Sequence, residues 1–224
     1  MTFENRADAG RQLAQALRHL RDRALVVFGL PRGGVVTAFE VAMALEAPLD
    51  VILVRKIGVP QQPELAAGAV VDGEDMQVVV NDDVLRGTGV SRDYVHRQAE
   101  RELGELERRR QLYVGTRERV PVAGRTAIVV DDGIATGATM RAALLGVRRR
   151  QPAHLVLAVP VAPPAAVAAL RAEVDEVVCL RAPAFFGAVG AFYDDFRQVS
   201  DDEVRELLAR AARRQAAPAP QEGT

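Results

Sequence analysis

Residues 129–139 read Val129-Val130-Asp131-Asp132-Gly133-Ile134-Ala135-Thr136-Gly137-Ala138-Thr139. An apolar run ends here in two adjacent carboxylates, a turn rich in Gly and Thr follows, and a helix-like segment continues from Met140. Unpaired backbone N–H groups in such a loop, together with the positive end of a helix dipole, form an anion site. Thr136 and Thr139 add hydroxyl donors, and Gly137 lets a phosphate approach the backbone. Because the carboxylates can accept hydrogen bonds from sugar hydroxyls or hold a divalent cation, the stretch predicts a site for a phosphorylated ribose.

The rest of the chain alternates between strand-like and helix-like patterns. Apolar runs predict strands at 24–29, 49–55, 125–131, 154–161 and 175–180, and periodic or capped segments predict helices at 6–20, 33–45, 140–150, 163–172 and 201–213. Two short strands at 68–71 and 76–80 indicate a hairpin. Strands that alternate with helices favour right-handed βαβ units. The sequence therefore predicts an α/β fold with a mostly parallel central sheet flanked by helices, with the acid pair at the ligand-binding end of a strand.

Residues 129–139 resemble the 5-phosphoribosyl-1-pyrophosphate (PRPP) signature of the type I phosphoribosyltransferases, and the resemblance, strongest to bacterial phosphoribosyltransferase-domain proteins, extends over about 24–196. It implies a Rossmann-like sheet with a small hood. It also implies that Asp131 and Asp132 contact the ribose hydroxyls and hold Mg²⁺, partly through water and substrate, while the loop binds the 5′-phosphate. The implied ribose and 5′-phosphate set is Asp131, Asp132, Gly133, Ala135, Thr136, Gly137, Ala138 and Thr139. The alternative is an ordinary strand whose end carries solvated acids.

A second candidate anion loop, Gly29-Leu30-Pro31-Arg32-Gly33-Gly34, also lies between a predicted strand and a predicted helix. Arg32 can clamp a pyrophosphate while the glycines expose backbone N–H groups. In the resembling family a pyrophosphate loop occupies this place and often carries a cis peptide before its basic residue. The resemblance thus implies a cis Pro31–Arg32 bond and pyrophosphate binding by Pro31, Arg32, Gly33 and Gly34. A tight strand-to-helix turn that requires glycine is the alternative.

Lys56 is the single lysine among 29 basic side chains of the Lys and Arg type. With Arg55 it ends a predicted strand, and a loop containing Gly, Pro and Glu64 follows up to Gly68. Both cations are candidates to reach the same pyrophosphate and offset the charge that develops on the leaving group. The predicted catalytic set is Lys56, Arg32, Asp131 and Asp132. Family members have a mobile loop near here that covers the site; a solvated basic strand end is the alternative.

Aromatic residues make up 4% of the chain and cluster between 181 and 196. The resemblance implies a hood at about 181–200 that holds the nucleophilic base, often by stacking. The candidates for base binding are Ile134, Phe185, Phe186 and Tyr193. Packing of these rings in the core is the alternative.

The segment Ser91 to Leu112 lies in a predicted helical insertion at about 82–115 and is dense in Arg and Glu. Ser91 and Asp93 make a helix start, and a sparse apolar stripe follows, formed by Tyr94, Val95, Leu103, Leu106 and Leu112. The segment is predicted to be a salt-bridged surface helix or an arm on a neighbouring subunit. We expect residues 1–214 to form a single domain and residues 215–224 to be a disordered tail.

Net charge, cysteine content and hydropathy limit the partners and the cellular compartment that we expect for this chain. The net charge is −1 and the pI about 6.3, which predicts neither nucleic acid nor a membrane as a partner. Cys179 is the only cysteine, so we expect a buried, inert thiol in a reducing, cytoplasmic compartment. No signal-like start and no apolar run of membrane-spanning length is found in the sequence. A homodimer is compatible with this pattern.

Taken with the resemblance, the sequence predicts an enzyme that uses PRPP and Mg²⁺ to transfer 5-phosphoribose to a nitrogenous base, with release of pyrophosphate. Ala135 departs from the pattern, because some purine-using members have an acid there that assists proton transfer. Glu64, His96 and His154 are candidate substitutes. A non-catalytic PRPP or nucleotide sensor is the main alternative. A phosphatase with an aspartyl nucleophile is disfavoured, because its acids normally alternate on the first strand.

Overall fold

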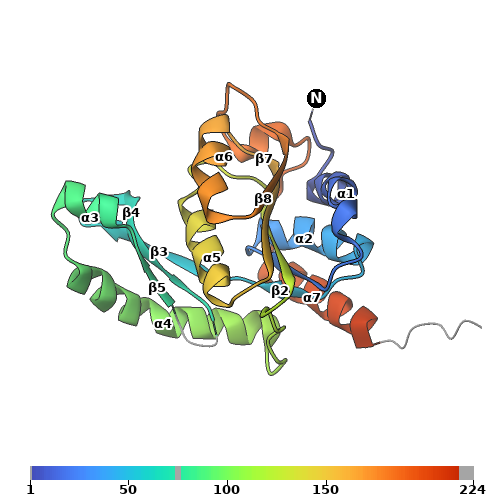
Figure 1. The fold of residues 1–224 in the computed structure, drawn as a ribbon, viewed down its shortest axis with the longest axis horizontal. Helices are drawn as coiled ribbons and strands as arrows, with labels where there is room; N and C mark the ends of the chain where they lie inside the picture. The colour runs from blue at the N-terminus through green and yellow to red at the C-terminus, as the bar shows by residue number, and fades with distance from the viewer. Residues whose placement is uncertain (1, 74–76, 217–224) are drawn as a thin grey trace, which may run out of the picture.

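The computed structural model describes residues 2–73 and 77–216, and its main feature is a parallel five-stranded sheet. The sheet has the order β2 (Leu49–Val51), β1 (Leu25–Gly29), β6 (Thr126–Val130), β7 (His154–Val161) and β8 (Glu176–Arg181). All four strand pairs are parallel. The predicted α/β class with a mostly parallel sheet flanked by helices is confirmed (Figure 1).

Helices cover both faces of this sheet. Figure 1 shows α1 (Arg6–Ala16) and α2 (Gly33–Ala44) on one side of the sheet, and α5 (Ala138–Arg149) and α6 (Pro164–Leu170) on the other. The terminal helix α7 (Asp201–Ala216) packs on α2. Three short 3₁₀ turns lie at Arg18–Leu20, Arg171–Glu173 and Val189–Phe192. The expected tail begins at 215, but α7 runs to Ala216, and residues 217–224 lie outside the described part of the chain.

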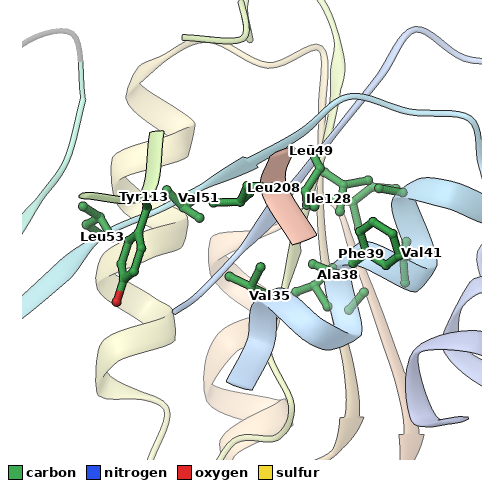
Figure 2. Close-up of a cluster of buried hydrophobic side chains, with 14 of the residues drawn as sticks. Val35, Ala38, Phe39, Val41, Leu49, Val51, Leu53, Tyr113, Ile128 and Leu208 are labelled. Carbon is green, nitrogen blue, oxygen red and sulfur yellow. The ribbon is translucent and has the colours of Figure 1, made fainter. Parts of the chain in front are cut away.

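The strand residues divide by alternation between two apolar clusters. Ile128 and Val130 of β6 face the cluster shared with α2 and α7, whereas Ala127 and Val129 face the cluster shared with α5. Figure 2 shows part of the first cluster, with Ile128 beside side chains of α2 and α7. Burial on both faces explains why the central strands read as continuous apolar runs.

A second, antiparallel sheet corrects one prediction. Its strands are β3 (Val54–Val59), β4 (Gln62–Val71) and β5 (Gln77–Val80), in the order β3-β4-β5. The predicted strand at 49–55 is therefore two strands in different sheets, and the loop predicted after Lys56 is a tight hairpin that turns at Pro60 and Gln61. Arg55 and Lys56 lie inside β3 and not at a strand end. The predicted hairpin of 68–71 with 76–80 is confirmed as β4 and β5.

The charged segment is a helix that packs on its own chain. After α3 (Asp82–Thr88), α4 (Arg92–Val114) begins at Ser91, whose hydroxyl accepts the backbone N–H of Tyr94. The helix contacts all three strands of the small sheet and also α7 (Figure 1). Its most buried residues are Val95, Ala99, Leu106, Tyr113 and Val114. The structure therefore supports a packed surface helix. The predicted stripe omitted Ala99, which lies four residues after Val95 on the same face, and it ended at Leu112, one residue before Tyr113.

A buried ion network fixes α4 against the sheets. Arg110 of α4 donates to Asp72 at 2.7 Å and to Asp50 at 3.4 Å, and Arg119 donates to Asp72 at 2.6 Å. The side chains of Asp50, Asp72 and Arg110 are 5%, 6% and 12% exposed, so these pairs are shielded from water. Breaking one partner of such a pair leaves a buried charge without compensation. The network therefore sets the position of α4 along the end of β2.

Cys179 on the edge strand β8 is half-buried and not fully buried, and burial raises the pKa of its thiol, which disfavours the reactive thiolate. In residues 2–73 and 77–216, none of the helices combines the length and the apolar character needed to cross a bilayer.

Candidate functional site

The two glycine-bearing turns lie side by side at the carboxyl edge of the parallel sheet. Gly29 and Val130 are partners in the β1–β6 register, so the turn after β1 and the loop after β6 leave the sheet at the same level. A Cβ atom on Gly33 would lie 2.0 Å from Asp132 Oδ2, and one on Gly34 would lie 2.7 Å from Asp131 Oδ1. Only glycine permits this approach, so the acid pair and the 31–34 turn form one site. The Pro31–Arg32 peptide is cis, as the resemblance implied.

The two aspartates have different surroundings. Asp131 Oδ1 accepts the backbone N–H of Asp132 at 2.9 Å. Burial, and secondarily the neighbouring charge of Asp132, raise the pKa of the Asp131 carboxyl well above its ordinary value. Asp132 is instead ion-paired with Arg6, whose Nε lies 2.6 Å from Asp132 Oδ2. The pair is largely buried, with 10% of the Arg6 side chain and 15% of the Asp132 side chain exposed.

Arg6 also connects the acid pair to the hood. Its Nη1 donates to the carbonyl of Arg197 at 2.8 Å, and its guanidinium carbon lies 3.7 Å from the centre of the Phe196 ring. The Tyr193 hydroxyl donates to the carbonyl of Asp132. Three hood residues thus hold the loop that carries the acids. No local pattern in the sequence marks Arg6, because its partner Asp132 lies 126 positions away.

The base-binding candidates separate into buried and exposed residues. Ile134 and Tyr193 are 3% and 6% exposed, and burial raises the pKa of the Tyr193 hydroxyl. Phe186 stacks on Phe192 with ring centroids 5.3 Å apart. Phe185 is 95% exposed. Of these four residues, Phe185 alone presents its whole ring to solvent, whereas core packing describes Tyr193, which contacts Phe3 and Phe196.

The loop after the acids leads into the amino end of α5. Gly137 adopts φ 83°, a left-handed conformation that suits glycine, and no side chain caps the helix that follows. The helix N–H groups are therefore left for a ligand. The threonines of this segment, Thr136 and Thr139, are both exposed to solvent. Val189 of the hood covers Gly133 so closely that a Cβ there would lie 2.4 Å from its Cγ1.

The first turn, the acid pair and α5 each contribute residues to the wall of one small cleft. Its volume is about 150 Å³, and its lining includes Pro31 of the first turn, Asp131 of the acid pair and Thr139 of α5. Leu106 and Arg109 of α4 form another part of the wall. Arg32 is half-exposed, and its Nη1 lies 3.8 Å from Asp201 Oδ1 of α7. The cleft thus has an acid, a hydroxyl and a helix amino end within one concave surface.

The two adjacent cations of β3 point away from each other. Arg55 donates to Glu102 of α4 at 2.8 Å, on one face of the small sheet. Lys56 lines a cavity of about 50 Å³ on the other face, together with Ala138 and Arg141 of α5. Successive strand residues face opposite sides, so the prediction that both reach the same pyrophosphate does not fit this geometry. Lys56 lies on the side of the amino end of α5.

The candidate substitutes for an acid at Ala135 are scattered. His154 begins β7, at the sheet edge opposite the acid pair, and its Nε2 lies 3.4 Å from Glu176. His96 is exposed on α4. The side chain of Glu64 lies outside the described residues. His154 is therefore remote from the cleft.

Comparisons with known proteins agree with this architecture. The family model for the phosphoribosyl transferase domain matches residues 78–197, a segment that contains the acid pair and most of the hood. A Mycobacterium tuberculosis protein that carries the provisional name phosphoribosyl transferase, in strains CDC 1551 and H37Rv, is 54% identical over 211 residues. That match covers 94% of this chain and 47% of the relative, so the chain spans about half the length of the curated relatives it matches.

A solved structure covers nearly the same length. The crystal structure of a protein from Thermus thermophilus is 46% identical to this chain and superposes with a TM-score of 0.84. The match covers 94% of this chain and 99% of that one. The two chains therefore share one fold over nearly their whole lengths.

Proposed function

The chain belongs to the phosphoribosyl transferase family, and from that premise we propose that it transfers 5-phosphoribose from PRPP to a nitrogenous base and releases pyrophosphate. One observation carries the proposal: the acid pair, the 31–34 turn and the amino end of α5 lie at one edge of the sheet, and Pro31, Asp131 and Thr139 line a common cleft. PRPP has a diol between two phosphate groups, which is the chemistry that this arrangement complements.

Each part of the edge has a role in binding. Asp131 and Asp132 accept hydrogen bonds from the ribose hydroxyls, and Arg6 holds the Asp132 carboxylate in place. The N–H groups that begin α5, with Thr136 and Thr139, bind the 5′-phosphate, and Lys56 adds positive charge on that side. The backbone of the 31–34 turn and the Arg32 guanidinium bind the diphosphate. Because the sugar is bound at both of its ends, its C1 atom is held in position for attack.

The chain also offers a donor set that suits magnesium. Among residues 2–73 and 77–216, no group of three or more Asp, Glu, His or Cys side chains gathers to hold a metal. Mg²⁺ commonly uses one or two carboxylates and completes its shell with water and substrate phosphates. The Asp131–Asp132 pair fits that requirement. When bound there, the ion would neutralise charge on the diphosphate.

Departure of the diphosphate makes the sugar carbon resemble an oxocarbenium ion, so the reaction depends on stabilising two separated charges. The ribose-bound carboxylates favour the positive sugar. The positive charge of Arg32 favours the negative leaving group, which is electrostatic catalysis by groups already in place. The nitrogen nucleophile then approaches C1 beneath the hood, where Phe185 is exposed for stacking.

The first experiment measures pyrophosphate release from labelled PRPP with Mg²⁺ and a panel of purine, pyrimidine and other nitrogen bases. Base-dependent release is the expected result, and calorimetry is expected to show PRPP binding without any base. Binding without release for every base would select the alternative of a PRPP sensor, for which Ala135 is the favouring feature. A chain that neither binds nor consumes PRPP contradicts both functions.

Replacing Phe185 by Ala tests the acceptor side of the site. Base stacking on an aromatic ring contributes about 1–3 kcal/mol, so the KM for the base identified in the panel is expected to rise about 5- to 100-fold. The KM for PRPP and the melting temperature should not change, because the ring is 95% exposed.

Phe186→Ala is the matched control for Phe185→Ala, because that ring is half-buried against Phe192. It is expected to lower the melting temperature through lost packing. If Phe185→Ala has the same KM for the acceptor base as the unmodified chain, Phe185 does not bind the base.

A further inference from the structure

The long helix α4 forms part of the cleft that Asp131 of the acid pair lines. The same cavity that is lined by Pro31 and Asp131 is lined by Leu106 and Arg109 of α4. Leu106 is buried, whereas 37% of the Arg109 side chain is exposed. The helix therefore places a cation in the wall of the cleft, which is also lined by Pro31 of the turn that carries Arg32.

The guanidinium of Arg109 has unused donors. Its Nε donates to Glu105 Oε1 at 2.9 Å, and Glu105 also accepts two bonds from Arg108. Within residues 2–73 and 77–216, no hydrogen bond engages the two terminal nitrogens of Arg109. These nitrogens form a planar fork that matches the spacing of phosphate oxygens. The side chain is thus oriented by Glu105 and still able to bind an anion.

The positive charges of Arg109 and Arg32 both lie near the hydrogen-bonded pair of Tyr113 and Asp201. The Tyr113 hydroxyl donates to Asp201 Oδ1 at 2.6 Å, and Arg32 Nη1 lies 3.8 Å from that oxygen. Burial and the hydrogen bond to Asp201 raise the pKa of Tyr113 to about 12, while the charges of Arg109 and Arg32 act in the opposite direction. The two guanidinium groups therefore come from α4 and from the 31–34 turn to the same region.

The position of Arg109 is fixed by its neighbour in sequence. Arg110 bonds to the buried carboxylates of Asp50 and Asp72. This anchor restricts both rotation and sliding of α4 along the sheet edge. Arg109 is consequently a preorganised cation, which costs little reorganisation when an anion binds.

We propose that Arg109 binds the diphosphate of PRPP together with Arg32 and the 31–34 turn, so that α4 completes the pyrophosphate subsite; the inference rests on the proposed function. In the transfer step the bond between C1 and the diphosphate oxygen breaks, and its electron pair stays with that oxygen. Arg109 stabilises the charge that develops there. C1 forms its new bond with the lone pair of the acceptor nitrogen, whose proton passes to solvent. The charged helix is therefore part of the active site.

The test compares Arg109→Gln with Arg108→Gln. Arg108 is the matched control, because it pairs with the same Glu105, but its side chain is 61% exposed and does not line the cleft. Both changes remove one surface charge and one helix pair, a small loss that each variant should tolerate without unfolding. Calorimetry with Mg²⁺ then measures binding of inorganic pyrophosphate, PRPP and ribose 5-phosphate to each full-length variant.

Arg109→Gln is expected to weaken pyrophosphate and PRPP binding about 10- to 100-fold and to leave ribose 5-phosphate binding unchanged. Arg108→Gln should bind all three ligands like the unmodified chain, and Arg109→Lys should recover part of the loss because it restores charge without the fork. Pyrophosphate binding by Arg109→Gln at the wild-type level overturns the inference and leaves the proposed function standing. Equal weakening of ribose 5-phosphate also overturns it. If the unmodified chain binds neither PRPP nor pyrophosphate, the proposed function falls as well.

Discussion

Asn in place of Asp131 is expected to weaken phosphoribosyl transfer strongly and, at neutral pH, to raise the melting temperature. The carboxylate is proposed to accept a ribose hydroxyl, and hydrogen bonds to a charged group contribute about 1.5–3 kcal/mol. We therefore expect kcat/KM for PRPP to fall about 100-fold. The substitution keeps an oxygen for the backbone N–H of Asp132, which Asp131 Oδ1 accepts at 2.9 Å.

The gain in stability follows from the raised pKa of Asp131. Burial, and secondarily the charge of Asp132, raise this pKa above the unfolded value, so the folded chain holds the proton more tightly than the unfolded chain. The resulting stabilisation is present below the unfolded pKa and is lost as pH rises through the folded pKa. At neutral pH the ionised carboxylate therefore costs stability, which Asn relieves. A single stabilising substitution commonly yields about 0.5–2 kcal/mol, which corresponds to roughly 1–8 °C at this chain length.

Thermal unfolding at several pH values measures this effect. The difference between Asp131→Asn and the unmodified protein should be largest at neutral pH and should vanish toward acid pH. In the unmodified protein, ionisation of Asp131 should make kcat/KM rise with pH. This rise should be absent in Asp131→Asn. A lower melting temperature at neutral pH would show that the carboxylate is structural, and retained activity would remove it from the ribose site.

Asp132→Asn is the informative partner of this variant, because its stability effect should have the opposite sign. The substitution leaves the Arg6 guanidinium, which is 10% exposed, without a carboxylate. Removing one side of a buried pair costs up to about 3–5 kcal/mol, and the residual solvent access here reduces that to about 2–3 kcal/mol. Both variants should lose PRPP binding, so a comparison of their melting temperatures separates loss of function from loss of fold.

Local patterns predicted the elements that carry the two loops. The strand at 154–161 matches β7 at both ends, and the loop between β6 and α5 was predicted from its acids, glycines and threonines. These segments are predictable because apolar strand runs and helix starts are properties of neighbouring residues. The cis bond at Pro31–Arg32 came from resemblance, since no local propensity favours it.

The unpredicted parts depend on partners far away in sequence. Gln61 turns the β3–β4 hairpin at φ 70° without the glycine that normally marks such a turn, so the segment resembled a loop. In the sequence, Arg6 looks like any arginine at the start of a helix. Its role is visible only in the fold, where Asp132 lies beside it. Arg109 is one of several arginines on α4, and only the register fixed by Arg110 turns it toward the cleft.

Gly34→Ala is expected to lower both stability and PRPP affinity, although alanine is the better helix former. Gly34 lies in the first turn of α2, where helix propensity alone would favour alanine by up to about 1 kcal/mol. The added Cβ would lie 2.7 Å from Asp131 Oδ1, 2.9 Å from Asp131 Cα and 3.1 Å from the Val130 carbonyl. The carboxylate can rotate, but the backbone atoms belong to the end of a central strand. The turn and the strand end must therefore separate, at a cost of about 1–3 kcal/mol.

The same separation displaces the acid pair from the 31–34 turn. A misplacement of about 1 Å can reduce turnover about 100-fold, so PRPP binding and kcat should fall further than the stability loss alone explains. Gly104→Ala on α4 is the matched control, because no atom lies within 4 Å of its added Cβ. That variant should gain up to about 1 kcal/mol from helix propensity and keep full PRPP affinity. Urea unfolding and PRPP calorimetry of both variants decide the matter: if Gly34→Ala matched Gly104→Ala in stability and affinity, the two turns would not be in contact in solution.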